Sequence, residues 1–258
     1  MRYLFLLLLF TKSIFAGAQT AAELNEQSKV FLDKKDFKNA LPLIKKASDM
    51  GNAEAQYNYA VCYQEGIIVP KSDMIANDLL LKSAKQGWID AQFKLAYSYT
   101  VGRGVDKDDK QAFYWSLQCA KQNDAECMWN VVGLYQLGRG TSKNIDSMLY
   151  WAIRLGSMPS PENLKISGQI TSARLNLAKM FYAGDMIKKD LVKSYAWYLL
   201  YNESKRDFSI IVQDQQIEAI KKLEAELSGA DKEAAKKQAE TYLKSPLHNL
   251  ANLYQQDK

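Results

Sequence analysis

The chain has 258 residues, of which 47% are hydrophobic and 24% are charged, the balance of an ordinary globular protein. Its 13 glycines and 5 prolines exclude collagen-like and low-complexity classes. The formal net charge is +5, and the single histidine, His248, excludes histidine-rich zinc sites and argues against Ser-His-Asp or Cys-His catalysis. No HExxH, Walker A or SxxK motif occurs in the sequence, so composition and motifs favour a protein that is not an enzyme.

Residues 1–18 have the composition of a secretory signal peptide. Arg2 supplies the positive start, residues 3–10 form an apolar run, and small residues up to Ala18 offer the pattern that precedes cleavage. The alternative is an uncleaved anchor, but an apolar run this short cannot span a bilayer. We predict cleavage near Ala18 and an exported protein, periplasmic or extracellular, with no membrane span in the mature chain. Loss of Arg2 and Lys12 lowers the net charge to +3, which gives no reason to expect nucleic acid as a partner.

A helical hairpin is predicted over residues 19–52. Two helical segments, Ala21–Asp33 and Phe37–Met50, are joined by a short turn at residues 34–36. This hairpin lacks the glycine-containing loop of the segments that follow.

An internal repeat begins after residue 52 and is marked by four glycines. Gly66, Gly102 and Gly138 are spaced by 36 residues, and Gly184 follows after a further ten-residue insertion. Three positions before the glycines stand aromatic residues: Tyr63, Tyr99, Tyr135 and Phe181. Hydrophobic and small residues also recur six, seven and eleven positions before each glycine, which is the spacing of one helix face. Each glycine is expected to end this helix in the left-handed conformation.

A second helix is predicted to follow each glycine. Six positions after the glycines stand good N-cap residues: Ser72, Asp108, Asn144 and Asp190. Small or hydrophobic residues recur four and seven positions after these caps in most copies, so the second helix is amphipathic as well. A period of 36 residues with two helices per unit predicts an all-α fold, an α-solenoid of antiparallel helix pairs.

The first two repeats carry a resemblance to a known family. Ala53–Gly87 reads AEAQYNYAVCYQEGIIVPKSDMIANDLLLKSAKQG, and Ile89–Asn123 reads IDAQFKLAYSYTVGRGVDKDDKQAFYWSLQCAKQN. Both resemble the Sel-one-like repeat, a relative of the tetratricopeptide repeat, and residues 125–156 and 171–204 are more diverged copies. The resemblance implies a right-handed solenoid of four repeats over residues 53–205, preceded by the hairpin 19–52 as a tetratricopeptide-like unit.

The second glycine of the family's loop is present only in the two middle copies, as Gly104 and Gly140. The outer copies have Ile68 and Met186 at this position. We therefore expect the loops of the outer copies to differ from the others in backbone shape.

The remaining segments interrupt or close the repeat. Residues 157–169 contain two prolines and are predicted to be an exposed loop insertion. Residues 206–245 are predicted to hold two C-terminal capping helices, Ile210–Leu227 and Asp231–Lys244, because their many Glu and Lys residues suit a solvated outer face. Residues 246–258 are expected to be a frayed tail.

Two of the three cysteines, Cys119 and Cys127, are eight residues apart at the junction between adjacent repeats. The resemblance extends to a cysteine-rich, secreted branch of the family that bridges neighbouring helices with this spacing, and it implies a Cys119–Cys127 disulfide. Both cysteines are shifted by one residue relative to that branch, which rotates each side chain by roughly 100° about its helix. The alternative is two ordinary buried small residues. Cys62 is the odd thiol, expected to be a partly buried filler and not a nucleophile.

The tetratricopeptide resemblance also implies that the first helix of each repeat lines a concave groove. The groove positions that we predict to bind a partner are Tyr57, Phe93, Tyr97, Trp129, Gln64, Gln136 and Tyr182. Large rigid rings beside amides suit the capture of a peptide or helix. The alternative is that these rings only pack between repeats. Three tryptophans of the second helices are expected to be core residues: Trp115, Trp151 and Trp197.

The sequence therefore predicts a non-catalytic, monomeric scaffold that binds a protein or peptide in its concave groove, with no cofactor and no metal. Family analogy offers two alternatives: a penicillin-binding or β-lactamase enzyme of the cysteine-rich branch, and an immunity protein against a secreted toxic effector. A third alternative is a glycan-binding or envelope-associated adaptor, because aromatic rings bind sugars as well as peptides. The absence of SxxK and of paired carboxylates gives the enzyme no support from the residues themselves.

Overall fold

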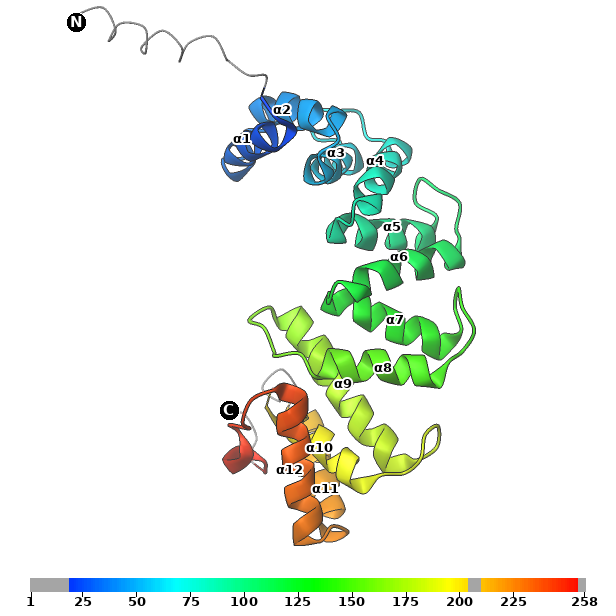
Figure 1. Ribbon diagram of the computed structural model, residues 1–258, viewed down its shortest axis with the longest axis vertical. Helices are drawn as coiled ribbons and strands as arrows, with labels where there is room; N and C mark the ends of the chain where they lie inside the picture. The colour runs from blue at the N-terminus through cyan, green and yellow to red at the C-terminus, as the bar shows by residue number, and fades with distance from the viewer. Residues whose placement is uncertain (1–18, 204–209, 255–258) are drawn as a thin grey trace, which may run out of the picture. The chain divides into compact units, whose positions relative to one another are not determined.

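The computed structural model describes residues 19–203 and 210–254 (Figure 1). Within these ranges the regular structure is helical and no strand occurs, which confirms the predicted all-α solenoid. The predicted signal peptide, residues 1–18, lies outside the described residues. Among the described helices, none is long and apolar enough to cross a membrane.

The chain divides into two compact units, named here the N-terminal and the C-terminal unit. The N-terminal unit comprises residues 19–98 and 103–106, and the C-terminal unit comprises residues 99–102 and the described residues from 107 onwards. The division falls at the end of α5 (Ile89–Val101) and in the loop after it, so it does not coincide with a boundary between repeats.

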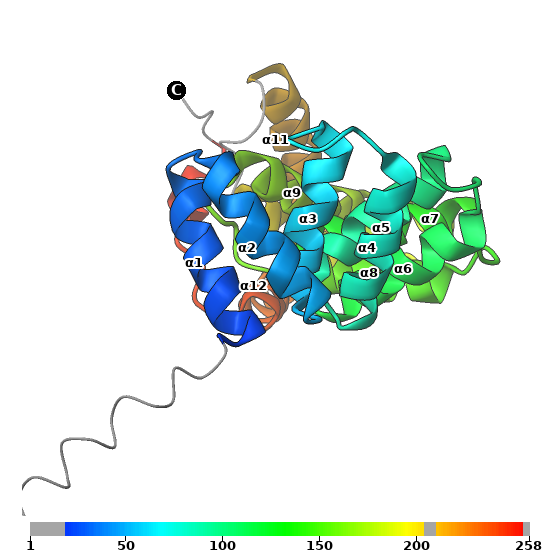
Figure 2. The same ribbon diagram turned by 90° about the horizontal axis from the view of Figure 1, so that it is seen from above.

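Successive helices pack side by side within each unit, as Figures 1 and 2 show. The N-terminal unit holds, besides most of α5, the helices α1 (Ala21–Asp33), α2 (Phe37–Asp49), α3 (Ala53–Glu65) and α4 (Asp73–Lys85). The C-terminal unit holds α6 (Asp109–Lys121), α7 (Ala125–Leu137), α8 (Ile145–Gly156), α9 (Leu164–Ala183), α10 (Leu191–Asn202), α11 (Ile210–Ala225), α12 (Gly229–Leu243) and a 3₁₀ turn at Leu250–Asn252.

The helix boundaries follow the glycines and caps of the repeat. Gly66, Gly138 and Gly184 end α3, α7 and α9 in the left-handed conformation, with φ of 71°, 69° and 75°. Side chains of the predicted N-caps accept hydrogen bonds from first-turn backbone N–H groups in α4, α6, α8 and α10: Ser72, Asp108, Asn144 and Asp190. These caps satisfy amide groups that have no partner inside the helix, so local sequence determines where each helix begins.

The arginine of each Gly-Arg-Gly loop holds the start of the second helix one repeat earlier. In the N-terminal unit, Arg103 Nε donates to Asp73 Oδ1 at 2.8 Å. In the C-terminal unit, Arg139 Nε donates to Asp109 Oδ1 at 2.8 Å, and its Nη2 donates to the Thr100 carbonyl at 3.3 Å. The same ion pair therefore recurs after 36 residues, once in each unit.

Ile68 has the backbone conformation of the glycines that it replaces. Its φ is 58°, in the same left-handed region as Gly104 at 68° and Gly140 at 71°, so the expected difference in loop shape is wrong for this copy. Met186 lacks a positive φ, as expected. The glycines are required for space: a Cβ at Gly104 or Gly140 would overlap the backbone at the start of the second helix one repeat earlier, whereas the Ile68 side chain is exposed.

The side-chain hydrogen bond from Arg139 holds the pKa of the Asp109 carboxyl below its ordinary value. Because this pKa is lower in the folded than in the unfolded chain, the pair stabilises the fold above the unfolded pKa, and its contribution is lost as the pH falls through the folded pKa. We expect Arg139→Gln to raise the pKa of Asp109 in an NMR titration, whereas Lys110→Gln, which removes a neighbouring charge, changes it far less. A pKa that stays low without Arg139 would contradict this pairing.

The exposed loop predicted for residues 157–169 is wrong only in its second part, because α9 begins at Leu164. α8 ends at Gly156, only residues 157–163 are non-helical, and α9 runs for 20 residues against 13 in α3 and α7. Asn163 caps α9 by accepting hydrogen bonds from two first-turn N–H groups. The added turns also bury Ile170, so they have a hydrophobic face of their own. The two prolines mark only the start of the insertion.

α10 is buried along most of its length and carries the core of the C-terminal unit. Every residue from Ser194 to Asn202 is buried, and α10 packs against α9, α11 and α12. Trp197 is fully buried, and its ring stacks on Tyr242 of α12 with centroids 4.6 Å apart. The other two tryptophans predicted to be core, Trp115 and Trp151, are buried as well.

The segment after α12 is docked on this core, so the expectation of a frayed tail is wrong for residues 246–254. The Glu203 carboxylate accepts hydrogen bonds from the backbone N–H groups of His248 at 3.0 Å and Asn249 at 2.9 Å. Leu253 is buried in the hydrophobic cluster around α10. The tail is therefore held by partners far away in the sequence, at the end of α10.

A side chain ten positions before the loop glycine clamps each first helix of the N-terminal unit to the end of the helix before it. The Gln56 amide donates to the Ser48 carbonyl at 3.4 Å, and the Gln92 amide donates to the Ala84 carbonyl at 3.0 Å. Both glutamines are buried. Each adds a side-chain donor to a carbonyl that also accepts the backbone N–H of the glycine just after the helix, Gly51 or Gly87.

Arg174 occupies the same register position in the last repeat, within the C-terminal unit. Its side chain is 1% exposed, and its Nε donates to the Gly156 carbonyl at 2.8 Å. Its Nη1 donates to Leu200 at 3.0 Å and its Nη2 to Met158 at 2.8 Å, again at backbone carbonyls. One guanidinium therefore joins the end of α8, the insertion and the end of α10.

We predict that Arg174→Met lowers the free energy of unfolding by at least about 3 kcal/mol, because it removes the donors of three backbone carbonyls at about 1–3 kcal/mol each. Chemical denaturation of purified protein measures the change. Gln92→Met is the matched control: it alters the same register position in the N-terminal unit and should cost about 1 kcal/mol. Equal losses in the two variants would show that Arg174 is not the stronger clamp.

Candidate functional site

The C-terminal unit has a hollow of about 390 Å³ between α7, α8 and α9. We call it the α7–α9 hollow. It is lined by Trp129, Val132, Gly133, Gln136, Met148, Ala152, Ala173, Asn176, Leu177, Lys179, Met180 and Met186. Its volume lies at the lower end of the range for ligand pockets in proteins.

Gly133 opens this hollow. It lies in the middle of α7, and a Cβ built on it would meet no atom within 4 Å. The same register position holds Val61, Tyr97 and Lys179 in the other three repeats. Glycine costs helix stability at such a position relative to alanine, by about 1 kcal/mol. The absence of a side chain here leaves open space where each of the other three repeats carries a side chain.

The hollow has apolar walls and a polar rim. Its hydrophobic residues include three methionines, whose flexible thioethers adapt to different shapes of ligand. Gln136 on α7 and Asn176 and Lys179 on α9 are exposed at the rim. None of the lining residues carries a carboxylate, hydroxyl, thiol or imidazole group. The chemistry that these residues provide is therefore burial of an apolar group, hydrogen bonding through amides, and one positive charge.

Two of the residues predicted to bind a partner, Trp129 and Gln136, line the α7–α9 hollow. Three others lie in the N-terminal unit: Tyr97 is 55% exposed, Phe93 is half-buried, and Tyr57 is half-buried with its ring 6.4 Å from that of Trp88. Burial raises the pKa of Tyr57. These three residues stay predictions as contact residues.

Gln64 and Tyr182 lie in surroundings that the groove prediction did not foresee. Gln64 is 4% exposed, so its side chain is not available to a partner. Arg103 donates to the backbone carbonyl of Gln64 at 3.4 Å. Tyr182 donates its hydroxyl at 3.1 Å to Glu226, the residue just after α11, and Lys222 of α11 lies 5.9 Å from its ring centre. The C-terminal cap thus contacts Tyr182 through α11 and the residue after it.

Other lining residues were missed by the sequence analysis. Asn176 and Met180 of α9 lie one residue outside the predicted groove register, and Met148 belongs to a second helix. The one signal available in the sequence was Gly133, a lone glycine inside an otherwise regular helix.

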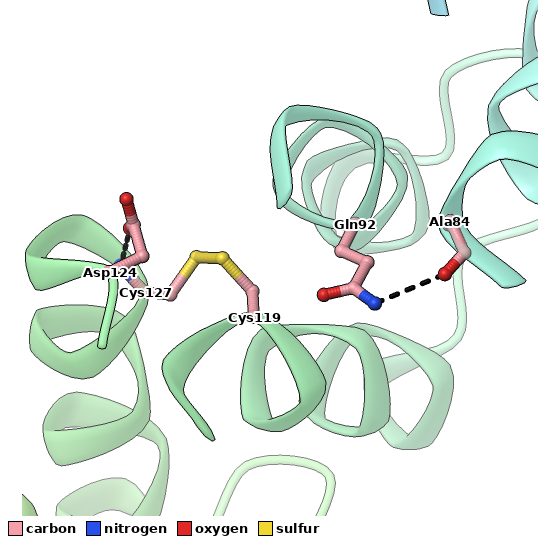
Figure 3. The surroundings of a disulfide bond; sticks show 5 residues. All are labelled: Ala84, Gln92, Cys119, Asp124 and Cys127. Atoms are coloured by element: carbon pink, nitrogen blue, oxygen red, sulfur yellow. Dashed lines mark hydrogen bonds between the residues drawn. A yellow bond between two sulfur atoms is a disulfide. The ribbon is translucent and has the colours of Figure 1, made fainter. Parts of the chain in front are cut away.

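A disulfide joins Cys119, near the end of α6, to Cys127 in the first turn of α7 (Figure 3). Their Cα atoms are 5.7 Å apart, within the range that a disulfide requires, because both residues are shifted in register together. Asp124 caps α7 by accepting from the Cys127 N–H at 2.8 Å. Met128 stands where other repeats have a clamping glutamine or arginine, and the disulfide links the two helices at this junction instead.

Cys119, Asp124 and Cys127 form one group of possible metal ligands in the described part of the chain, with ligand atoms within 4.8 Å of one another. Both sulfur atoms are used by the disulfide, so this group offers a metal no thiolate while the bond is intact. Cys62 is a buried free cysteine, and burial raises the pKa of its thiol.

Thiol titration of the oxidised, unfolded protein should find one free thiol, that of Cys62. Reduction should then destabilise the fold by about 2–3 kcal/mol, the effect expected of a short loop closed by a disulfide. Cys62→Ser should abolish the free thiol without altering the effect of reduction. Three free thiols in the oxidised protein would contradict the disulfide.

Comparison with known proteins agrees with this architecture. The Sel1 repeat model matches residues 53–88, 89–124 and 171–200. The chain therefore carries Sel1 repeats in these three segments, and its fold is an all-α solenoid. No curated protein matched the sequence significantly.

Structural comparison gives two solved structures. A Sel1 repeat protein from Oxalobacter formigenes has a TM-score of 0.61 at 21% identity, covering 88% of this chain and 87% of its own. A protective antigen of uropathogenic Escherichia coli displaying an SLR fold has a TM-score of 0.42 at 18% identity, covering 91% of this chain and 55% of its own. At its level of identity the first similarity concerns the fold alone.

Proposed function

We propose that this protein is an exported, non-catalytic interaction scaffold whose C-terminal unit binds a partner protein by taking an apolar side chain into the α7–α9 hollow. Sel1 repeats are generally protein-interaction modules, which supports the class of function. The observation that carries the proposal is the open space at Gly133, in a hollow also lined by the half-buried Trp129. Tryptophan in a pocket from which water can be displaced is a common energetic centre of protein interfaces.

The lining of the hollow supports binding over catalysis. An acyl-transfer enzyme such as a penicillin-binding protein needs a nucleophile and a base within hydrogen-bond reach of each other. The described lining residues offer neither, and Lys179 is exposed at the rim. We therefore favour the scaffold over the penicillin-binding or β-lactamase enzyme. The most exposed predicted ring of the N-terminal unit, Tyr97, is a candidate for additional contacts, and we expect the mature protein to be a monomer.

Filling the hollow should block partner binding while the fold stays intact. We expect Gly133→Leu to abolish capture of the native partner from envelope extract, because leucine occupies the space left by glycine without meeting other atoms at its Cβ. Gly133→Ala is the matched control: it gives the same gain in helix propensity, about 1 kcal/mol, but leaves most of the hollow open. Quantitative mass spectrometry of captured proteins and thermal melting measure the two effects.

The outcome distinguishes binding in the hollow from binding elsewhere. Proteins captured by wild type and Gly133→Ala but lost with Gly133→Leu support the proposal, provided that neither variant lowers the melting temperature. Identical capture by all three forms would place the interaction outside the hollow and contradict the proposal.

A further inference from the structure

The charged groups around the α7–α9 hollow differ between its two ends. At the start of the two helices, Glu126 of α7 forms an ion pair with Lys165 of α9, so these charges compensate each other. At the other end Lys179 is exposed in the last turns of α9, and it forms no ion pair with any residue in the described ranges 19–203 and 210–254. The lining itself contains no acidic residue. The hollow thus has one uncompensated positive charge, located at one end.

The polar rim also has groups that match a polypeptide main chain. Gln136 stands on one wall and Asn176 on the other, and both side chains are exposed. A carboxamide donates and accepts hydrogen bonds, as a peptide group does, so two amides on facing helices suit an extended or helical segment that passes between them. A simple aliphatic molecule would form no hydrogen bonds with these two carboxamides.

We propose, on the basis of the proposed function, that the bound segment combines a bulky apolar anchor with a nearby acidic residue. The anchor enters the space at Gly133 and contacts Trp129. The main chain then runs between the amides of Gln136 and Asn176, and the carboxylate of the acidic residue faces Lys179. Charge complementarity fixes the direction in which the segment lies, because the opposite end of the hollow has its charges already paired.

The anchor pocket should accept several apolar residues. Its walls include Met148, Met180 and Met186, and methionine side chains adjust to ligands of different shape. We therefore expect leucine, methionine and phenylalanine to serve as anchors, whereas polar residues fail. The acidic residue, by contrast, should be selected by the single charge of Lys179, so reversing that charge should reverse the preference.

A phage-displayed random peptide library tests this inference on the full mature chain. The library is selected in parallel on four forms of the protein: wild type, Gly133→Leu, Lys179→Glu and Lys188→Glu. Lys188 is an exposed lysine of the following loop that does not line the hollow, so its variant controls for the change in net charge. We expect apolar–acidic motifs on wild type and Lys188→Glu, their loss on Gly133→Leu, and lysine or arginine in place of the acid on Lys179→Glu.

A capped synthetic peptide of the selected motif gives the magnitude. Changing its Glu to Gln should weaken binding to wild type by about fivefold, the upper range for an exposed ion pair, and should have no effect with Lys179→Met. Decanoate serves as the competing probe, since it joins an apolar chain to a carboxylate without peptide groups. Binding of decanoate that is tighter than that of the peptide and lost in Gly133→Leu would identify a free amphiphile as the occupant and overturn the inference.

The remaining outcomes separate the two proposals. Peptides that need an open Gly133 but show no acidic preference, or keep that preference on Lys179→Glu, overturn the inference and leave the proposed function standing. Selection that yields no peptide sensitive to Gly133→Leu overturns the proposed function and the inference with it.

Discussion

Hydrogen bonds from buried side chains to backbone carbonyls at the end of a second helix attach the next hairpin at three of the junctions. The last turn of a helix has carbonyl groups without intrahelical partners, and burying them unpaired is costly. Here the following first helix supplies the donor from one register position, as glutamine in the N-terminal unit and as Arg174 in the last repeat. The buried alanine and leucine residues provide nonpolar area, and the polar clamps add directional hydrogen bonds at one register position.

The repeat could be predicted from the sequence because the signals at its helix boundaries are local. Glycines in the left-handed conformation and N-caps such as Asp108 act within a few residues, so their spacing predicts each helix boundary directly. The docked tail could not be predicted in the same way. Its partners at Glu203 and in the core around α10 lie more than forty residues away in the sequence, and no local pattern records that contact.

The insertion and the candidate site show a related limit. The prolines at the start of the insertion predicted a loop, although Asn163 is a good N-cap residue and begins α9. At the site, two of the residues predicted for the groove, Trp129 and Gln136, line the hollow. The hollow itself depends on the absence of a side chain at Gly133. A glycine inside a helix indicates reduced helix stability when read in sequence. Only the packing of three helices around Gly133 shows that the missing side chain leaves usable space.

Arg174 also limits how far the repeats can be treated as modules. Repeat engineering assumes that units of equal length can be deleted, duplicated or exchanged at their boundaries. The last repeat carries a buried guanidinium that needs carbonyls from α8, from the insertion and from α10 at once. If the last repeat followed any other repeat, Arg174 would keep only one of these carbonyl partners. Its buried charge would then lack the other two hydrogen bonds, at a cost of several kcal/mol. The position of α9, between α8 and α10, therefore depends on one arginine.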